Sequence, residues 1–85
     1  STVVSYSLEE IEDLIYGRQG HSTLKPEHVV LTNKYLADTK NRGRILRLLQ
    51  ISKNKGIKTT IVNAETRAGL RLSQLGGLVC FAKPK

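Results

Sequence analysis

The clearest hydrophobic pattern lies in the last thirty residues of the chain. A β-branched run over Ile57–Val62 predicts a strand, and an amphipathic segment over Glu65–Leu75 predicts a short helix. Gly76-Gly77 ends that helix, and the wholly apolar run Leu78–Ala82 predicts a strand that is buried on both faces. Because a strand–helix–strand unit usually connects parallel strands, we expect Leu78–Ala82 to be an interior strand parallel to Ile57–Val62.

The first helix is predicted by a capping box and by apolar residues at helical spacing. Ser7 and Glu10 stand three residues apart, as in a capping box, and Gly17 is suited to a left-handed C-terminal cap. Ahead of this helix, Val3–Ser5 predicts either a short edge strand or an ordered lead-in. The apolar stripe of the helix consists of Leu8, Ile11, Leu14 and Ile15.

The middle of the chain predicts one buried strand and one longer helix. Val29–Thr32 favours an internal strand, because it is apolar on both faces. Asn33–Asn41 is polar and predicts an irregular loop, with Asp38 or Thr39 as the N-cap of the next helix. That helix extends to Lys55, and its inward stripe consists of Ile45, Leu48, Leu49 and Ser52.

The 85-residue chain is short enough for one core, so residues 1–85 are expected to form a single domain. Helices and strands alternate along it, which favours the α/β class. We therefore expect a three-layer α/β/α sandwich with a small, mostly parallel sheet.

The charge of the chain is strongly one-sided. It carries 14 Lys and Arg against 7 Asp and Glu, and residues 39–58 hold seven basic residues and no acidic one. Such a segment is typical of a protein that binds a polyanion such as nucleic acid, although a solvated basic helix face is the alternative. We expect one face of the long helix to point to solvent or to a ligand, namely the face formed by Lys40, Arg44, Arg47, Ile51 and Lys55.

No catalytic set, metal site or cofactor motif is visible, so we expect a protein that is not an enzyme and needs no cofactor. His21 and His28 are too few to ligate a metal and are expected in an exposed loop. Cys80 is the single cysteine and lies in the most apolar run, which favours a buried thiol and a reducing, cytoplasmic setting. No run approaches the roughly 20 apolar residues of a membrane span, so we expect no membrane partner.

Four segments carry a resemblance to a known family. Val29–Asn33 is a strand that leads into a polar segment, Arg44–Gly56 is a central helix that ends on Lys-Asn-Lys-Gly, and Ile57–Val62 is the next strand. The most specific segment is Gly69–Val79, GLRLSQLGGLV, which is similar to a family phrase G-x-x-L-x-x-L-G-G-I-A-A. Together these segments resemble the C-terminal domain of Pelota and of the eukaryotic and archaeal peptide-chain release factor, and more distantly the kink-turn-binding ribosomal proteins.

The resemblance implies a Pelota-like RNA-binding module that acts on structured RNA or ribosomal particles, in translation or ribosome rescue. Tyr35 lies among cations and could stack on an unpaired base, or it could instead cover the apolar edge of its own loop at Leu36. Arg67 and Arg71 on the last helix are further candidates for RNA contact. The main candidate RNA-binding residues are Lys34, Tyr35, Lys40, Arg42, Arg44 and Arg47.

The same resemblance implies an alternative function, because the domain also docks a translational GTPase in these relatives. The chain would then be a protein-interaction domain for such a GTPase or another partner. Its contacts would be Ile51 and the acidic first helix, with Glu9, Glu10, Glu12 and Asp13.

Overall fold

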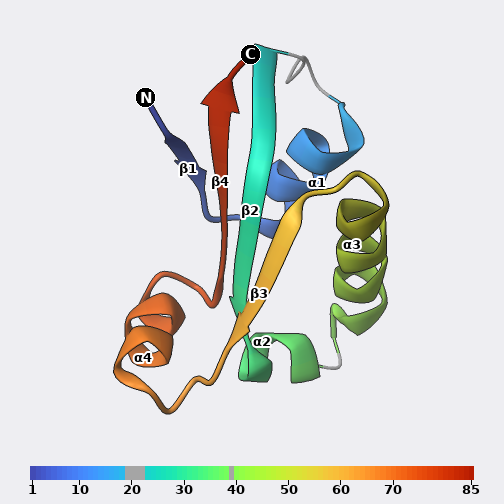
Figure 1. The fold of residues 1–85 in the computed structure, drawn as a ribbon. Helices are drawn as coiled ribbons and strands as arrows, with labels where there is room; N and C mark the ends of the chain where they lie inside the picture. The colour runs from blue at the N-terminus through green and yellow to red at the C-terminus, as the bar shows by residue number, and fades with distance from the viewer. Residues whose placement is uncertain (19–22, 39) are drawn as a thin grey trace.

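A computed structural model describes residues 1–18, 23–38 and 40–85 of the chain. Within these ranges the strands form one four-stranded sheet in the order β1-β4-β2-β3 (Figure 1). β4 pairs antiparallel with both β1 and β2, and β2 pairs parallel with β3. The strands are β1 (Val3–Ser5), β2 (Leu24–Thr32), β3 (Lys58–Val62) and β4 (Leu78–Pro84).

The sheet is mixed, so the prediction of a mostly parallel sheet is wrong. β4 is an interior strand, as expected, but it runs antiparallel to β2 and therefore also opposite to β3. The connecting helix α4 (Arg67–Gln74) has 8 residues and rises only about 12 Å. It stays beside the edge of the sheet where β3 ends, so the chain enters β4 from that same edge (Figure 1).

Two helices, α1 (Leu8–Tyr16) and α3 (Arg42–Asn54), pack on one face of the sheet and enclose the core. Both predicted stripes face inward: the four apolar residues of α1 are buried, as are Ile45, Leu48 and Ser52 of α3, while Leu49 is partly buried. The core cluster consists of Leu8, Ile11, Ile15, Val29, Leu31, Ile45, Leu48, Leu78 and Cys80.

The opposite face of the sheet is covered incompletely by the described residues. Leu72 of α4 is buried against it, whereas Leu75 at the end of α4 is 52% exposed. α4 lies at one end of this face only (Figure 1). The predicted three-layer arrangement is therefore not confirmed.

Several element boundaries differ from the prediction. β2 begins at Leu24 rather than at Val29, because its ladder with β4 continues past a bulge between Pro26 and His28. His28 consequently lies in a strand and not in a loop, and its Nε2 is 2.7 Å from Thr60 Oγ1. His21 lies outside the described residues. No helix in the described ranges combines the length and the hydropathy that a membrane crossing needs.

The segment expected to be an irregular loop contains a short helix, α2 (Asn33–Ala37). The buried Thr32 caps it, because its hydroxyl oxygen accepts a hydrogen bond of 3.0 Å from the backbone N–H of Tyr35. α3 then begins at Arg42. Its N-cap is Asn41 and not the predicted Asp38. The other cap candidate, Thr39, lies outside the described residues.

The end of α4 is a tight turn that requires glycine. Gly76 and Gly77 have φ angles of +108° and +89°, so both lie in the left-handed region and end the helix where the sequence predicted. Gly77 N–H donates to the Leu72 carbonyl at 2.9 Å and Gly76 N–H to the Ser73 carbonyl at 3.0 Å, the two bonds of a Schellman motif. The caps of α1 are likewise confirmed, since Ser7 accepts from Glu10 N–H and Gly17 has a φ of +71°.

Gly69 allows α4 to cross closely over the end of β3. A Cβ atom at this position would collide with the backbone of Asn63 and Ala64, whereas a Cβ at Gly43 in α3 would meet nothing within 4 Å. We expect Gly69→Ala to destabilise the fold by at least about 2 kcal/mol through overpacking against backbone. Gly43→Ala is the control and should stabilise it by about 0.5–1 kcal/mol through helix propensity. Urea unfolding measures both, and equal midpoints for the two variants would contradict the close crossing.

Cys80 is a free cysteine that is fully buried in the core, and burial raises the pKa of its thiol to about 11. In the unfolded chain the thiol ionises at pH ~8.5. Below that pH the thiol is neutral in both states, so the free energy of unfolding carries no penalty for burying it. As the pH rises toward 11, only the unfolded chain loses this proton, so the free energy of unfolding falls. We expect a thiol-specific disulfide reagent at pH 8 to label the urea-unfolded chain at once and the native chain only through slow unfolding. Rapid labelling of the native chain would contradict the buried position.

Candidate nucleic-acid interface

The predicted basic face of α3 packs against the acidic helix α1. Arg44 donates to both carboxylate oxygens of Glu12, from Nε at 3.2 Å and from Nη2 at 2.5 Å. The Glu12 side chain is only 11% exposed, whereas that of Arg44 is 50% exposed. These hydrogen bonds raise the pKa of the Arg44 guanidinium above its ordinary value. The basic segment is therefore neutralised in part by a carboxylate from thirty-two residues earlier in the chain.

Two further cations on α3 also serve the contact with α1. The guanidinium of Arg47 lies 5.7 Å from the centre of the Tyr16 ring, and that of Arg18 lies 5.1 Å from it. Lys55 donates from Nζ to the Ile15 carbonyl at 2.6 Å, near the C-terminal end of α1, where a cation is favourable. Arg44, Arg47 and Lys55 are exposed, as expected for this face, but each also contacts α1.

Tyr35 is half-buried in α2 and packs against the end of the sheet. A Cβ atom on Gly77 would lie only 3.0 Å from Cδ1 of the Tyr35 ring, and Tyr35 packs against the core cluster. Burial is the main cause that raises the pKa of Tyr35. These contacts are of the kind expected if Tyr35 covers an apolar edge, although the edge is formed by Gly77 and the core rather than by Leu36.

Four further exposed cations lie on the segments that follow the ends of β2 and β3. Lys34 lies in α2, Lys40 lies just before the N-cap of α3, Arg42 is the first residue of α3, and all three are exposed. The Ala64 N–H donates to Asn33 Oδ1 at 2.8 Å, which holds the β3–α4 connection against the start of α2. The exposed Arg67 opens α4 three residues later. We call Lys34, Lys40, Arg42 and Arg67 the carboxyl-edge cations.

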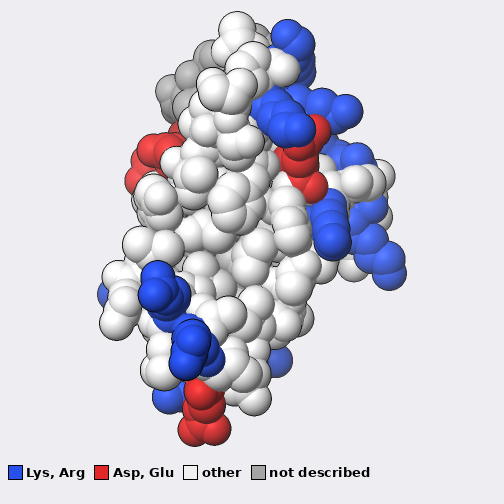
Figure 2. Space-filling view, turned by 60° about the vertical axis from the view of Figure 1, so that its left-hand side comes forward, with Lys and Arg blue, Asp and Glu red and all other residues white. Residues whose placement is uncertain are grey.

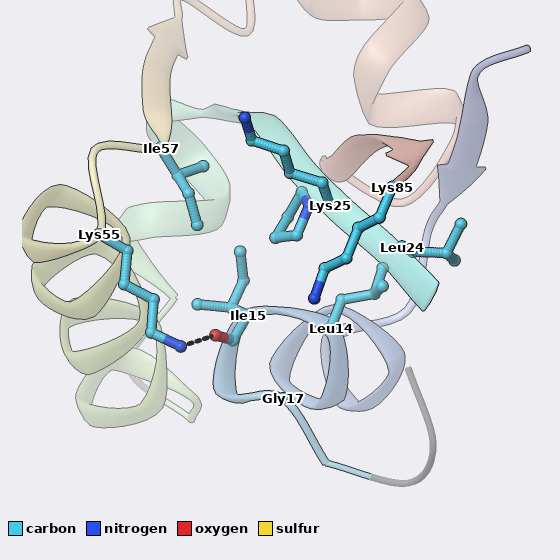
Figure 3. Close-up of a pocket in the computed structure, with 9 residues that line it drawn as sticks. Leu14, Ile15, Gly17, Leu24, Lys25, Lys55, Ile57 and Lys85 are labelled. Atoms are coloured by element: carbon cyan, nitrogen blue, oxygen red, sulfur yellow. Dashed lines mark hydrogen bonds between the residues drawn. The ribbon is translucent and has the colours of Figure 1, made fainter. Parts of the chain in front are cut away.

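The opposite end of the molecule has a lysine-lined pocket of about 270 Å³ between α1 and β2. Figure 3 shows that Lys55 is held by the Ile15 carbonyl and that Lys85 extends toward α1, whereas Lys25 points away from it. The ammonium groups therefore do not converge on one point, as tight binding of a single anion would require. The pocket is lined by Leu14, Ile15, Gly17, Leu24, Lys25, Pro26, Lys55, Ile57 and Lys85.

Few of the cations form ion pairs within the described part of the chain. The three ion pairs there are Arg18–Asp13, Arg44–Glu12 and Lys83–Glu27. The carboxyl-edge cations are absent from them, although the backbone N–H of Lys40 donates to Asp38 Oδ1 at 3.0 Å. In the space-filling view, basic side chains form separate groups around a broad uncharged face (Figure 2). No three His, Cys, Asp or Glu residues in the described ranges come together as a metal site would require.

The carboxyl-edge cations are among the candidates that the sequence suggested, with Arg67 as one of the further candidates. The sequence did not suggest that α1 would pair with the basic helix. A signal was present, since the four acidic residues of the first helix could pair with the basic helix. Sequence alone did not indicate that the two helices would be neighbours on one face of the sheet.

No protein-family model matches the sequence, and no curated protein is significantly similar to it. The fold, however, is similar to part of archaeal Pelota in a model of ribosome-bound archaeal Pelota and ABCE1. That match has a TM-score of 0.78 and 23% sequence identity, and it covers 94% of this chain and 20% of that one.

A second match is Dom34 of S. cerevisiae, described as a translation termination-like factor involved in RNA quality control pathways and interacting with Hbs1. The TM-score is 0.78 with 24% identity, over 95% of this chain and 22% of that one. The chain thus spans about a fifth of the length of these solved structures. The predicted resemblance to a Pelota domain is confirmed at the level of the fold.

The Arg44–Glu12 pair generates a stability prediction with a matched control. Arg44→Glu removes the partner of the poorly exposed Glu12 and places a second carboxylate beside it, so it should lower the urea midpoint more than Arg42→Glu, which makes the same charge change at an exposed residue without an ion-pair partner among the described residues. The double variant Glu12→Arg with Arg44→Glu should recover part of the loss. Equal midpoints for Arg44→Glu and Arg42→Glu would show that the pair does not stabilise the packing of α1 on α3.

Proposed function

We propose that this chain is a non-enzymatic RNA-binding module of the translation machinery, which acts in the cytoplasm on structured RNA or ribosomal particles. Its fold is that of a part of Pelota, which is ribosome-bound in one matched structure, and of Dom34, which is involved in RNA quality control pathways. Its net charge of +7 suits a polyanionic partner.

The carboxyl-edge cations carry this proposal. They come from α2, the region where α3 begins and the start of α4, and they have no ion-pair partner among the described residues. In α/β sheets, ligands commonly bind beyond the carboxyl ends of the strands, which is where these residues lie. Each cation that meets a phosphate releases a condensed counterion, so such a cluster favours an RNA backbone without reading its sequence.

Arg44, Arg47 and Tyr35 take a secondary place in the proposal. The guanidinium of Arg44 is already bonded to Glu12, that of Arg47 lies over the Tyr16 ring, and Tyr35 packs against Gly77. A phosphate would have to compete with these contacts, whereas it can approach Lys34, Lys40, Arg42 and Arg67 directly. We therefore assign the main phosphate contacts to the carboxyl edge.

Docking of a protein such as a translational GTPase is the second candidate, favoured by a mostly apolar groove of about 430 Å³ on the open face of the sheet. The dependence of binding affinity on salt concentration distinguishes the two functions. Phosphate binding weakens with a slope of about −0.7 to −0.9 per neutralised phosphate in a plot of log K against log salt, whereas an interface of apolar anchors responds much less.

RNA binding should depend on the carboxyl edge. We expect Lys34→Glu with Arg42→Glu to weaken binding to a mixture of labelled RNA hairpins and single strands at least about tenfold at ~50 mM salt. The magnitude of the salt slope should fall by about 1.5, because two phosphate contacts are lost. Fluorescence anisotropy between ~50 and ~200 mM salt measures both quantities.

The matched control is Lys53→Glu with Lys58→Glu, which makes the same charge change at exposed sites where α3 ends and β3 begins. It should weaken binding by no more than about threefold, through net charge alone. Circular dichroism and urea midpoints confirm that both variants fold. Equal loss in the two double variants would overturn the assignment to the carboxyl edge, and failure of the parent chain to bind RNA at low salt would overturn RNA binding itself.

A further inference from the structure

The face of the sheet that α1 and α3 leave free contains a groove of about 430 Å³. Side chains of all four strands form its floor or run along its edge, and α4 forms one wall. Figure 2 shows the uncharged surface that extends between the groups of basic side chains on this side of the molecule. We call this feature the open-face groove; it is lined by Val4, Tyr6, Val30, Val62, Ala68, Arg71, Leu72, Leu75, Val79 and Phe81.

The residues that line the open-face groove are mostly apolar, as is typical of a surface that another element covers rather than of a surface exposed to water. An antiparallel sheet that faces water on one side normally alternates apolar and polar residues. Here β4 instead turns Leu78 and Cys80 toward the core and Val79 and Phe81 toward the groove. Two large side chains on the groove are half exposed, Tyr6 at 50% and Leu75 at 52%. An apolar surface of this kind marks an interaction site.

The charge of the groove indicates the chemistry of its occupant. Arg71 is the only charged residue among the described groove-lining residues, and Arg67 lies one helical turn before it on α4. Neither arginine has an ion-pair partner among the described residues. An occupant that places carboxylates at the α4 wall would supply the missing partners, and Tyr and Arg, which both line the groove, are residue types that often dominate binding energy.

We propose that the open-face groove binds an amphipathic helix of a partner protein, with carboxylates beside its apolar stripe. The apolar stripe would lie on Val30, Val79 and Phe81, and the carboxylates would meet Arg71 and Arg67. This is the helix-in-groove mode of peptide recognition. The groove itself is lined by none of the carboxyl-edge cations, and Arg67 at its rim is the one residue that the two proposed surfaces share.

Two other occupants fit the groove less well. A second copy of this chain also carries a charge of +7, and a groove that contacts a different patch of its copy would produce an open assembly. A small molecule would need several polar groups that converge on it, whereas Arg71 and the Tyr6 hydroxyl are the main ones on the described lining.

The proposal is tested with a labelled helical peptide of about 18 residues, which makes five turns, with leucines along one stripe and glutamates beside it. A matched peptide has lysines in place of the glutamates. We expect the acidic peptide to bind the 85-residue chain at least about tenfold more tightly than the basic one in fluorescence anisotropy. Arg71→Glu should remove or reverse that preference.

Two leucines of the α4 region provide a matched pair of variants. Leu75 is 52% and Leu70 is 57% exposed, but only Leu75 lines the groove. Leu75→Glu should weaken binding of the acidic peptide at least about tenfold, because it places a charge in the apolar contact. Leu70→Glu makes the same charge change outside the groove and should leave binding within about twofold. Both sites are exposed, and circular dichroism confirms folding.

The proposal is overturned if neither peptide binds, if the two peptides bind equally, or if Leu70→Glu weakens binding as much as Leu75→Glu. An unlabelled RNA hairpin serves as a competitor. If it displaces the peptide and its own binding is also lost in Leu75→Glu, the groove is an RNA surface and the protein-helix assignment is wrong.

Discussion

The burial of β4 is the constraint from which the rest of the fold follows. Its neighbouring residues Leu78 and Val79 are both buried although their side chains point to opposite faces, so the strand needs cover on each side. Pairing with β1 and β2 places it in the interior of the sheet. α1 and α3 pack on one face, while the eight residues of α4 cover only an end of the other. The open-face groove is the part of that second face that the described residues do not cover.

The packing of α1 on α3 determines which cations remain for a ligand. Glu12 is largely withdrawn from water, and an unpaired carboxylate there would be costly, so the guanidinium of Arg44 is needed at this point. Arg47 and Lys55 follow on the same side of α3 and contact Tyr16 and the Ile15 carbonyl. The charge of the basic segment therefore serves two purposes, since one part fastens the helices together and the other part stays exposed at the carboxyl edge.

Features that depend on a few neighbouring residues could be predicted from the sequence, and those that depend on long-range pairing could not. The caps at Ser7, Gly17 and Gly76 follow from local backbone chemistry, and the inward stripes follow from helical period. The direction of β4 depends on the end of the sheet at which α4 lies, because the chain enters β4 from there. An apolar run in the sequence does not encode that position. The pairing of Glu12 with Arg44 likewise requires knowledge that α1 and α3 are neighbours. For the candidate site, sequence identified Lys34, Lys40 and Arg42, but it could not show that Arg44 and Arg47 are engaged by another helix.

α4 connects the two proposed surfaces, because Arg67 lies at the carboxyl edge and Arg71 lines the open-face groove one turn later. RNA phosphates at Arg67 would reduce the positive potential that attracts carboxylates to Arg71, and both charges lie within one Debye length of each other. An acidic helix in the groove would in turn repel phosphate at the edge. Linkage requires the two effects to be equal in free energy, so RNA and an acidic helix would each weaken the binding of the other by the same factor. A chain with both surfaces would therefore exchange one partner for the other more readily than it would hold both at once.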